Sequence, residues 1–316
     1  MKPRPGFALL AALWLLVALS VASLALGVAA RTRRLAAANL SEHVRAAAAA
    51  RAGFEQLRGR LERRLNESGA TATGGGALNL IDPWRRADSL LVDTIAVADA
   101  RAIVRVHDVG TALHLNRATE DDLRRFFVAL RVDAGDADRL AQAIADWRDP
   151  DDLHRARGAE RDAYLTAGAP ALPRNGPFQA LPELLSVRGM TPALYGRVRP
   201  YLTLLGSGQV NLNLSDRPVL LALPGMTEEA VAVLLRYRRQ RRTIGSIADL
   251  ERDLSPGARR ELTAALPTLL ARTTPETREL EIVSEGWLPG SPVRVRATGL
   301  LVRSRGAVFY VWSRVE

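Results

Sequence analysis

The stretch GFALLAALWLLVALSVASLALGVAA, residues 6–30, decides the fold, because no charged side chain interrupts it. An α-helix over residues 7–30 rises about 1.5 Å per residue and so reaches roughly 36 Å. The hydrocarbon core of a bilayer is about 30 Å thick. Basic residues flank the apolar stretch on both sides: Lys2, Arg4, Arg31, Arg33 and Arg34. The sequence therefore predicts a single transmembrane helix over 7–30 that anchors the chain in a membrane.

A cleaved secretory signal peptide is the alternative explanation of this N-terminus, because it too combines a basic start with an apolar run. The apolar part of such a peptide is about 7 to 15 residues long, much shorter than this one, and no good small-residue cleavage site precedes Arg31. The basic residues on both flanks leave the orientation of the helix open.

A short basic leader that ends in Gly6 and continues directly into Phe7 and a long apolar helix resembles the N-terminus of type IV pilins and pseudopilins. The resemblance implies that a prepilin peptidase removes the leader, residues 1–6, on the cytoplasmic face of the membrane. It also implies that the new terminal residue, Phe7, is N-methylated. The N-terminus would then lie in the cytoplasm and the body of the protein outside it.

Position 11 distinguishes this chain from most pilins and pseudopilins. They usually carry Glu at the fifth mature residue, whereas this chain has Ala11. In the family, that Glu neutralises the terminal amine of the subunit above it, since an unpaired charge inside a bilayer is costly. A subunit that lacks the Glu has nothing to offer a neighbour above it, as expected at a tip. Together with the helical insertion described below, the chain resembles the K-type minor pseudopilins of the type II secretion system.

This resemblance implies a role in assembly rather than in catalysis. The chain would be a non-enzymatic subunit at the tip of the periplasmic pseudopilus, where it helps to initiate assembly and limits pseudopilus length during protein export across the outer membrane. The implied partners are the minor pseudopilins of the I and J types, the pseudopilus, the prepilin peptidase and the inner-membrane assembly platform. The implied location is the bacterial inner membrane, crossed once, with the globular part in the periplasm.

Past the membrane span, the helical pattern continues. Leu57, Leu61 and Leu65 recur at helical spacing between charged residues, which predicts an amphipathic stem helix over 31–68. The glycines at 74–76 then end the helix. The overall expectation is an α+β fold in which this long stem packs against a sheet.

The strand-like segments lie in two separate parts of the chain. Runs rich in Val and Ile occur at 89–98, 101–108, 279–285, 293–303 and 307–315. We therefore expect a split antiparallel sheet of the pseudopilin type, with its first part within 77–112 and its second part within 273–316. An insertion between them would leave the early and late strands in one sheet.

The insertion is helical and internally repetitive. Leu115-Asn116 precedes one candidate helix start and Leu212-Asn213 precedes another, with polar residues that can cap a helix at the same offsets. We expect an inserted α-helical domain over 113–208 and a helix-hairpin-helix-like unit over 209–272.

Helix-hairpin-helix units often bind DNA, so the alternative function is a membrane-anchored DNA-binding protein that resembles competence receptors. Five arginines follow the second hairpin: Arg236, Arg238, Arg239, Arg241 and Arg242. Against DNA binding, the hairpin PGMT at 224–227 lacks a second glycine, and Glu228 and Glu229 occupy the helix start that a phosphate would approach. Nucleic acid is therefore not an expected partner.

A cluster of acidic residues interrupted by Pro150 is the candidate metal site. It comprises Asp146, Asp149, Asp151, Asp152, Glu160 and Asp162. Carboxylates that converge in a turn suit calcium, a hard cation that prefers oxygen ligands, and the resemblance to K-type pseudopilins favours the same ion. The spacing is not that of an EF-hand loop, and helix capping or solvated turn charge explains the cluster equally well.

The remaining composition offers no catalytic constellation. The chain of 316 residues has no Cys, which excludes disulfides and thiol chemistry, and its four His residues are scattered. No zinc-protease, nucleophile-elbow or P-loop motif occurs. The net charge of +10, from 44 basic and 34 acidic residues, fits a membrane-anchored body. We expect no enzymatic activity and no cofactor other than the candidate calcium.

Overall fold

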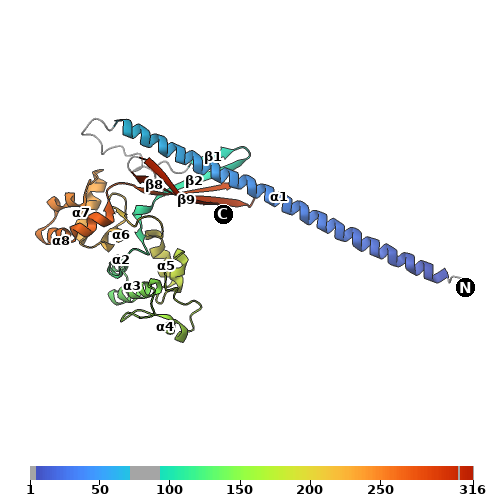
Figure 1. Ribbon diagram of the computed structural model, residues 1–316, viewed down its shortest axis with the longest axis horizontal. Coiled ribbons are helices and arrows are strands. Elements are labelled where there is room, and N and C mark those ends of the chain that lie inside the picture. Colours follow the sequence, from blue (N-terminus) through green and yellow to red (C-terminus); the bar gives the residue numbers. More distant parts are fainter. Residues whose placement is uncertain (1–4, 72–92, 305–306, 316) are drawn as a thin grey trace.

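The computed structural model describes residues 5–71, 93–304 and 307–315 and shows an α+β fold (Figure 1). One long helix, α1 (Pro5–Thr71), forms the stem. A five-stranded antiparallel sheet packs on the C-terminal half of α1, and a helical region is inserted between the second and third strands of that sheet. The fold class is as expected from the sequence.

The N-terminal half of α1 extends alone from the rest of the protein. Within Leu9–Arg63 this helix is long and apolar enough to cross a membrane, and the apolar window is not buried against any other part of the described chain. Leu9 is 77 % exposed and Trp14 is 67 % exposed. Side chains of this kind need an apolar environment that the protein itself does not supply, which fits a membrane anchor.

The sheet joins early and late segments of the sequence. Its strands are β1 (Asp93–Val97), β2 (Ala100–Asp108), β7 (Glu279–Trp287), β8 (Arg294–Ser304) and β9 (Ala307–Val315), in the spatial order β1-β2-β7-β8-β9. All neighbours pair antiparallel. The chain leaves the sheet after Asp108 and returns at Glu279, and Asp108 pairs with Leu280. The insertion therefore begins and ends at the same end of two neighbouring inner strands, β2 and β7.

The stem lies directly on the sheet because small residues face each other across the contact. Ala46, Ala50 and Gly53 of α1 are opposite Gly286 and Ser284 of β7. A methyl group built on Gly286 would overlap the carbonyl oxygen of Ala46 and lie 2.6 Å from the backbone nitrogen of Ala50. Close approach of two backbones of this kind requires glycine.

Larger side chains complete the core farther along α1. Phe54, Leu57 and Leu61 are buried against the apolar side chains of β2 and β7, among them Val104 and Ile282. These residues alternate with half-exposed ones along each strand, so only one face of the sheet is covered by the stem.

The inserted helical region contains two copies of one arrangement. The first copy comprises η2 (Val109–Thr111), β3 (Leu113–His114), α2 (Glu120–Ala129), α3 (Ala134–Arg148), α4 (Arg161–Thr166), η3 (Leu181–Ser186), α5 (Pro192–Val198), η4 (Arg199–Tyr201) and β4 (Leu202–Thr203). The second copy comprises β5 (Val210–Asn211), α6 (Arg217–Ala222), α7 (Glu228–Arg239), η5 (Ile247–Asp253), α8 (Pro256–Arg272) and β6 (Thr273–Thr274). In each copy the first short strand pairs parallel with the last, β3 with β4 and β5 with β6.

The two asparagines noted in the sequence occupy equivalent positions. The amide of Asn116 donates to the carbonyl of Phe178 and accepts from the amide N–H of the same residue, both at 2.9 Å. Asn213 forms the same pair of bonds with Ile244, at 2.9 and 3.1 Å. Each asparagine thus ties the start of its copy to the segment that precedes the 3-10 helix.

One half-buried arginine in each copy binds two carbonyls at the start of that copy. Arg148, at the end of α3, donates to the carbonyls of Leu115 and Ala118. Arg238, near the end of α7, donates to the carbonyls of Leu212 and Ser215, which stand at the same offsets from the asparagine. Burial lowers the pKa of Arg238 to about 10.

Two buried carboxylates connect the sheet and the two helical copies. Asp108, at the end of β2, accepts from the amide of Gly110 at 2.8 Å, from Asn211 at 2.7 Å and from the Thr277 hydroxyl at 2.6 Å. It therefore holds the second copy and both ends of the insertion together. Ser215 Oγ adds a bond to the carbonyl of Gly110 at 2.9 Å.

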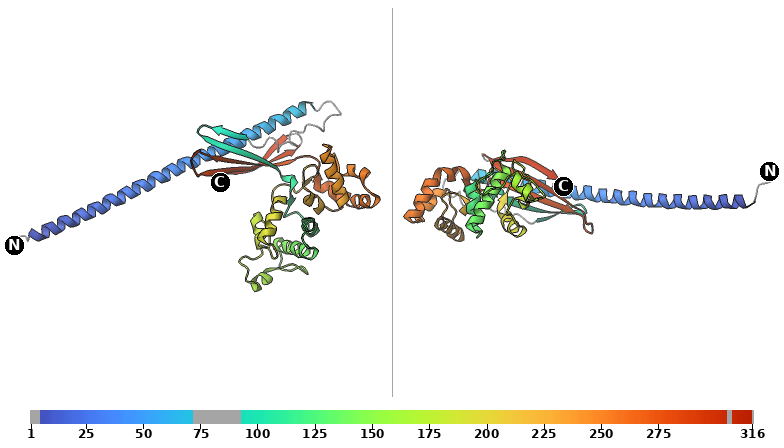
Figure 2. Two further views of the ribbon diagram at one scale, coloured as in Figure 1. Left: turned by 180° about the vertical axis from the view of Figure 1, so that it is seen from behind. Right: turned by 90° about the horizontal axis from the view of Figure 1, so that it is seen from below.

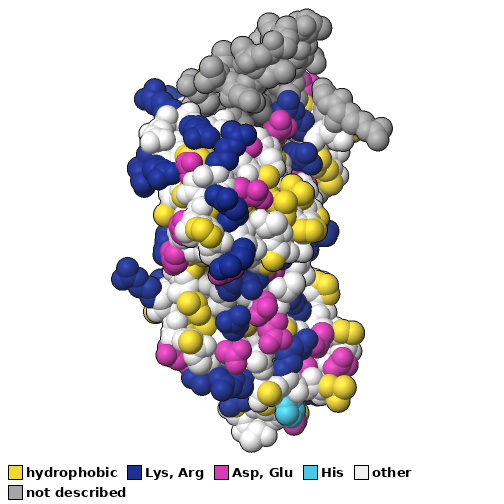
Figure 3. Space-filling view, turned by 90° about the vertical axis from the view of Figure 1, so that its left-hand side faces the viewer, with side chains coloured by type: hydrophobic (Ala, Val, Ile, Leu, Met, Phe, Trp, Pro, Cys, Tyr) yellow, Lys and Arg dark blue, Asp and Glu magenta, His cyan; other side chains and the backbone are white. Residues whose placement is uncertain are grey.

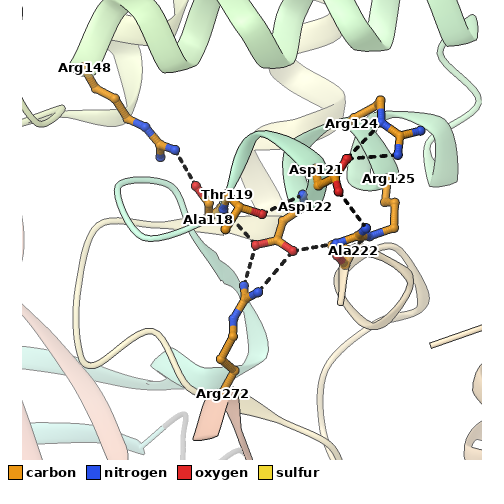
Figure 4. Close-up of polar contacts among 9 residues, drawn as sticks. All are labelled: Ala118, Thr119, Asp121, Asp122, Arg124, Arg125, Arg148, Ala222 and Arg272. Atoms are coloured by element: carbon orange, nitrogen blue, oxygen red, sulfur yellow. Dashed lines mark hydrogen bonds and ion pairs between the residues drawn. The ribbon is translucent and has the colours of Figure 1, made fainter. Parts of the chain in front are cut away.

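The second carboxylate, Asp122 of α2, joins the first copy to the second (Figure 4). It forms ion pairs with Arg272 at 2.5 Å and with Arg125 at 2.8 Å, and it caps its own helix by accepting from the amide of Thr119 at 2.8 Å. Burial favours a raised pKa at Asp122, but the bonds from Arg272 and Thr119 outweigh it and hold the pKa below its usual range. Arg125 also donates to the carbonyl of Ala222 in α6 at 2.9 Å.

One end of the molecule is an apolar helix and the other is a polar helical region. The bare apolar half of α1 forms one end, and the helical region, with α6, α7 and α8, lies at the opposite end of the sheet (Figure 1). Figure 2 shows the same separation from behind and from below.

We expect Gly286→Ala to destabilise the fold, because the added methyl group would force the stem away from β7. The cost should be about 1 to 3 kcal/mol or more, as in overpacked cores. Thermal unfolding of the purified chain in detergent, followed by circular dichroism, measures this loss. Gly257→Ala is the matched control, since nothing lies within 4 Å of a methyl group at that position. Equal stability of both variants would contradict the close contact.

Candidate functional site

Three carboxylates of the first copy converge where α3 ends and α4 begins. Asp146 lies in the last turn of α3, Asp149 caps that helix, and Glu160 precedes α4. Each offers one oxygen, and the three oxygens lie within 4.8 Å of one another. Pro150 cannot continue α3, so the chain turns back and brings Glu160 over the end of the helix.

Arginine satisfies only part of this cluster. Arg155 Nη1 donates to Asp146 Oδ1 and to Asp149 Oδ2, both at 2.5 Å, and Arg155 Nε donates to Glu120 at 3.1 Å. Asp149 Oδ1 and both oxygens of Glu160 are buried without a hydrogen-bond partner in the described chain. Buried carboxylate oxygens without partners are costly, which favours either a proton or a cation between them.

The electrostatics of the cluster point the same way. Burial, followed by the negative charges of Asp146 and Asp149, raises the pKa of Glu160 to about 7. The pKa of Arg155 is raised because its bonds to Asp149 and Asp146 outweigh its own desolvation. Negative charge is therefore concentrated around Glu160, and one guanidinium does not neutralise it.

Gly158 is the second structural requirement of the site. A methyl group at this position would overlap the carboxylate of Asp146 and displace it from its place in the cluster. Sequence reasoning does not single out Arg155 or Gly158. The only signal was a basic residue and a glycine within an otherwise acidic segment.

The structure brings together three of the six predicted metal ligands and places the other three elsewhere. Asp151 accepts from the amide of Leu153 at 2.9 Å, Asp152 accepts from the Asn175 side chain at 2.8 Å, and Asp162 accepts from the amide of Ala163 at 2.8 Å. These three side chains stabilise local turns and the start of α4, as helix caps and Asx turns do. Of the six predicted carboxylates, Asp146, Asp149 and Glu160 are therefore the ones that lie together in the structure.

The arrangement suits a hard divalent cation. Calcium takes 6 to 8 oxygen ligands, of which Asp146, Asp149 and Glu160 would supply part. The unpartnered oxygens of Glu160 and Asp149 fit this requirement, whereas Arg155 competes for the same carboxylates.

The hairpin of the second copy is packed rather than open. A methyl group on Gly225 would lie 2.6 Å from Ala265 Cβ and 2.8 Å from the carbonyl oxygen of Glu261, both in α8. Glu228 forms an ion pair with Arg217, and Glu229 accepts from the amide and hydroxyl of Ser255. The hairpin thus packs against α8, and both glutamates at the start of α7 have partners of their own.

Three of the five arginines after this hairpin have structural partners. Arg238 is the half-buried arginine described above, Arg236 pairs with Asp253 at 2.9 Å, and Arg242 stacks 3.8 Å from the ring centre of Tyr237. Arg239 and Arg241 remain. On the face shown in Figure 3, basic side chains alternate with acidic ones and form no continuous basic surface. This arrangement does not favour a DNA interface.

The residues of the leader junction lie at the start of the stem. Gly6 and Phe7 belong to the first turn of α1, and Ala11 follows in the same helix with its side chain exposed. Most of the leader itself, residues 1–4, lies outside the described residues.

Comparisons with known proteins agree on one family. A protein-family model described as "Type II secretion system (T2SS), protein K" matches residues 102–207. The type II secretion system protein K of Aeromonas hydrophila is 30% identical over 157 residues, which cover 44% of this chain and 46% of the relative. A putative type II secretion system protein K of Escherichia coli K12 is 32% identical over 114 residues, or 34% of this chain and 35% of the relative. The alignments thus span less than half the length of these relatives.

A solved structure extends the likeness in fold to most of the chain. A chain in the crystal structure of the GspK-GspI-GspJ complex from the type 2 secretion system of enterotoxigenic Escherichia coli superposes with a TM-score of 0.59 at 17% identity. The match covers 84% of this chain and 99% of that chain.

We expect Glu160→Gln to stabilise the calcium-free protein at alkaline pH. Because the pKa of Glu160 is about 7 when folded and about 4.5 when unfolded, the folded state binds more protons between these values. Stability then falls as pH rises through this interval. The gain of Glu160→Gln should grow from near zero at pH 5 to about 1 to 3 kcal/mol at pH 8. Thermal unfolding in chelator measures it.

Asp162→Asn is the control for this prediction, because that carboxylate lies outside the cluster. An equal effect of Glu160→Gln at both pH values would show that Glu160 is not held protonated by its surroundings.

Proposed function

We propose that this chain, which belongs to the family of type II secretion system protein K, is a non-enzymatic minor pseudopilin at the tip of the secretion pseudopilus. It would help to initiate assembly and limit the length of the pseudopilus during export across the outer membrane. The observation that carries this proposal is the position of the helical region, which occupies the end of the sheet opposite the membrane helix.

The geometry gives a physical reason for capping. Subunits of a helical filament stack along their stems, so the end of the sheet farthest from the membrane must remain accessible to the next subunit. Here two packed helical copies lie at that end, tied to the sheet by Asp108 and to each other by Asp122. The helical region would sterically block a further subunit at this end. Ala11 supports the same role, because it offers no carboxylate to an amine above it.

The proposed partners follow from the family and from the N-terminus. The similar solved chain comes from a complex with GspI and GspJ, and we propose the corresponding minor pseudopilins as neighbours of this stem. Cleavage between Gly6 and Phe7 by the prepilin peptidase, methylation of Phe7 and contact with the inner-membrane assembly platform belong to the same proposal. It places the globular part in the periplasm, anchored by one span in the inner membrane.

A membrane-anchored DNA receptor is the less supported alternative. The packing of the hairpin at Gly225 against α8 and the structural partners of Arg236, Arg238 and Arg242 leave few groups for phosphate contacts.

We further propose that the cluster of Asp146, Asp149 and Glu160 binds calcium. The buried, unpartnered oxygens of Glu160 and Asp149 support this proposal. A bound cation would favour the ionised form of Glu160 and tie α4 to the end of α3.

The capping role predicts that overproduction of the native chain shortens or suppresses pseudopili. A matched variant replaces residues 109–279 by a two-residue turn, which is feasible because Asp108 and Leu280, the residues that then flank the turn, are paired in adjacent antiparallel strands. Overproduction of this variant should let subunits stack and should not shorten pseudopili. Electron microscopy of sheared pseudopili gives the lengths. Longer pseudopili on overproduction of the native chain would refute capping.

Ala11 supplies a second arm of the same test. Ala11→Glu should bring no gain in assembly, because at a tip the carboxylate meets no amine and costs about 2.5 to 3.5 kcal/mol on insertion scales. Ala12→Glu adds the same charge one residue away and is the matched control. Better incorporation of Ala11→Glu than of Ala12→Glu would indicate an internal subunit.

Calcium should stabilise the purified chain if it binds only the folded state. The gain is RT ln(1 + [L]/Kd), about 2.7 kcal/mol at a hundredfold excess over Kd, and appears as a higher melting temperature. Asp149→Asn should abolish this shift, whereas Asp151→Asn should retain it because Asp151 lies outside the cluster. An unchanged melting temperature in calcium and in chelator would leave the cluster as an arginine-bound structural site.

A further inference from the structure

A second concave site lies where the two helical copies meet. It is a cavity of about 490 Å³ between α2, α6 and the start of α7. It is lined by Arg124, Arg125, Val128, Ala129, Arg131, Arg217, Leu221, Met226 and Glu228. None of these residues belongs to the acidic cluster, and the proposed capping role does not use them.

The floor of this cavity is apolar. Leu221 and Met226 are 9 % and 4 % exposed and belong to the core, whereas Val128 on α2 is 45 % exposed at the rim. An exposed aliphatic side chain beside a concave apolar floor is a feature of binding sites. The floor can bury an aliphatic or aromatic side chain of a ligand.

The rim carries more positive than negative charge. Arg124 pairs with Asp121 at 3.0 Å, Arg217 pairs with Glu228, and Arg125 shares the buried Asp122 with Arg272 (Figure 4). The lining therefore carries four arginines, and three carboxylates, Asp121, Asp122 and Glu228, pair with three of them; the fourth is Arg131. In the part of the chain that the structure describes, Arg131 is exposed and forms no ion pair.

We propose that this cavity binds an acidic segment of a protein partner, with an aliphatic or aromatic side chain on the floor and carboxylates on Arg131 and its neighbours. The inference rests on the proposed tip role, since a tip meets proteins ahead of the pseudopilus. Every cation at the site is an arginine, whose planar fork pairs with carboxylates through two parallel hydrogen bonds. The partner is a protein other than a pseudopilin.

The size of the cavity favours a peptide segment over a lipid. A floor built from a few side chains accommodates one or two side chains of a ligand, whereas an acyl chain needs a long apolar channel. The surplus of positive charge matches one or two carboxylates at the segment's flanks, which completes the ion pairing of the rim.

The test is a photo-crosslinker, p-benzoylphenylalanine, placed at position 128 of the full chain in cells with an active secretion system. We expect a discrete protein adduct whose crosslinked peptide carries carboxylates next to an apolar residue. Arg131→Glu should reduce the adduct roughly tenfold, as expected for loss of a charged hydrogen bond, and Arg131→Lys should keep only part of it, because lysine retains the charge but lacks the planar fork. Arg260→Glu, a charge reversal at an exposed arginine of α8, is the matched control.

Each other outcome would overturn the proposal. These outcomes are a lipid adduct, an adduct with a pseudopilin, a crosslinked peptide without carboxylates, equal adducts in Arg131→Glu and Arg260→Glu, and no adduct in a chain that still supports secretion. Circular dichroism of purified Arg131→Glu separates loss of binding from misfolding.

The lengths of pseudopili separate this inference from the tip role. If the cavity binds a partner ahead of the tip, Arg131→Glu lowers secretion and leaves pseudopilus length unchanged. If the tip role itself is wrong, overproduction of the native chain fails to shorten pseudopili, whatever the crosslinker captures.

Discussion

One buried carboxylate, Asp108, determines where the helical region sits. It lies at the point where the chain leaves the sheet, and it accepts hydrogen bonds from the first residues of the insertion, from Asn211 of the second copy and from Thr277 on the returning segment. A carboxylate that is 5 % exposed must keep these partners, because an unpaired buried charge is costly. The position of the helical bulk relative to the stem, on which any capping role depends, is therefore fixed by polar contacts at one junction.

Both copies contact the sheet at Asp108, and they also contact each other. The first copy bonds to Asp108 through the amide of Gly110 and the second through Asn211. The Asp122 network, with Arg272 at the end of α8 and Arg125 reaching the carbonyl of Ala222, ties the first copy to the second. Two buried carboxylates thus hold the helical region together and to the sheet. Both resist separation, since breaking either would strand a charge in a dry environment.

Sequence patterns predicted the parts whose physics is local or periodic. The apolar span, the strands on either side of the insertion and the paired Leu-Asn starts are visible because each follows from spacing along the chain. The acidic site was only half predictable: Asp146, Asp149 and Glu160 were recognised as acidic, but which carboxylates converge depends on the path of the loop, on Gly158 and on Arg155. The roles of Arg148 and Arg238 depend on contacts with distant carbonyls, which leave no periodic signal.

The two helical copies differ at the equivalent positions where the first copy has its candidate cation site. Each copy has a half-buried arginine that binds the carbonyls at its start. The residue two positions before that arginine lies next to the connection that follows the helix. That residue is Asp146 in the first copy and Arg236 in the second, where it pairs with Asp253. The first connection is long enough to bring Glu160 back, whereas in the second Arg242 stacks on Tyr237 and closes it. A carboxylate at this position attracts a cation, whereas an arginine repels one. The two copies therefore have the same backbone arrangement but differ in the charge of one connection.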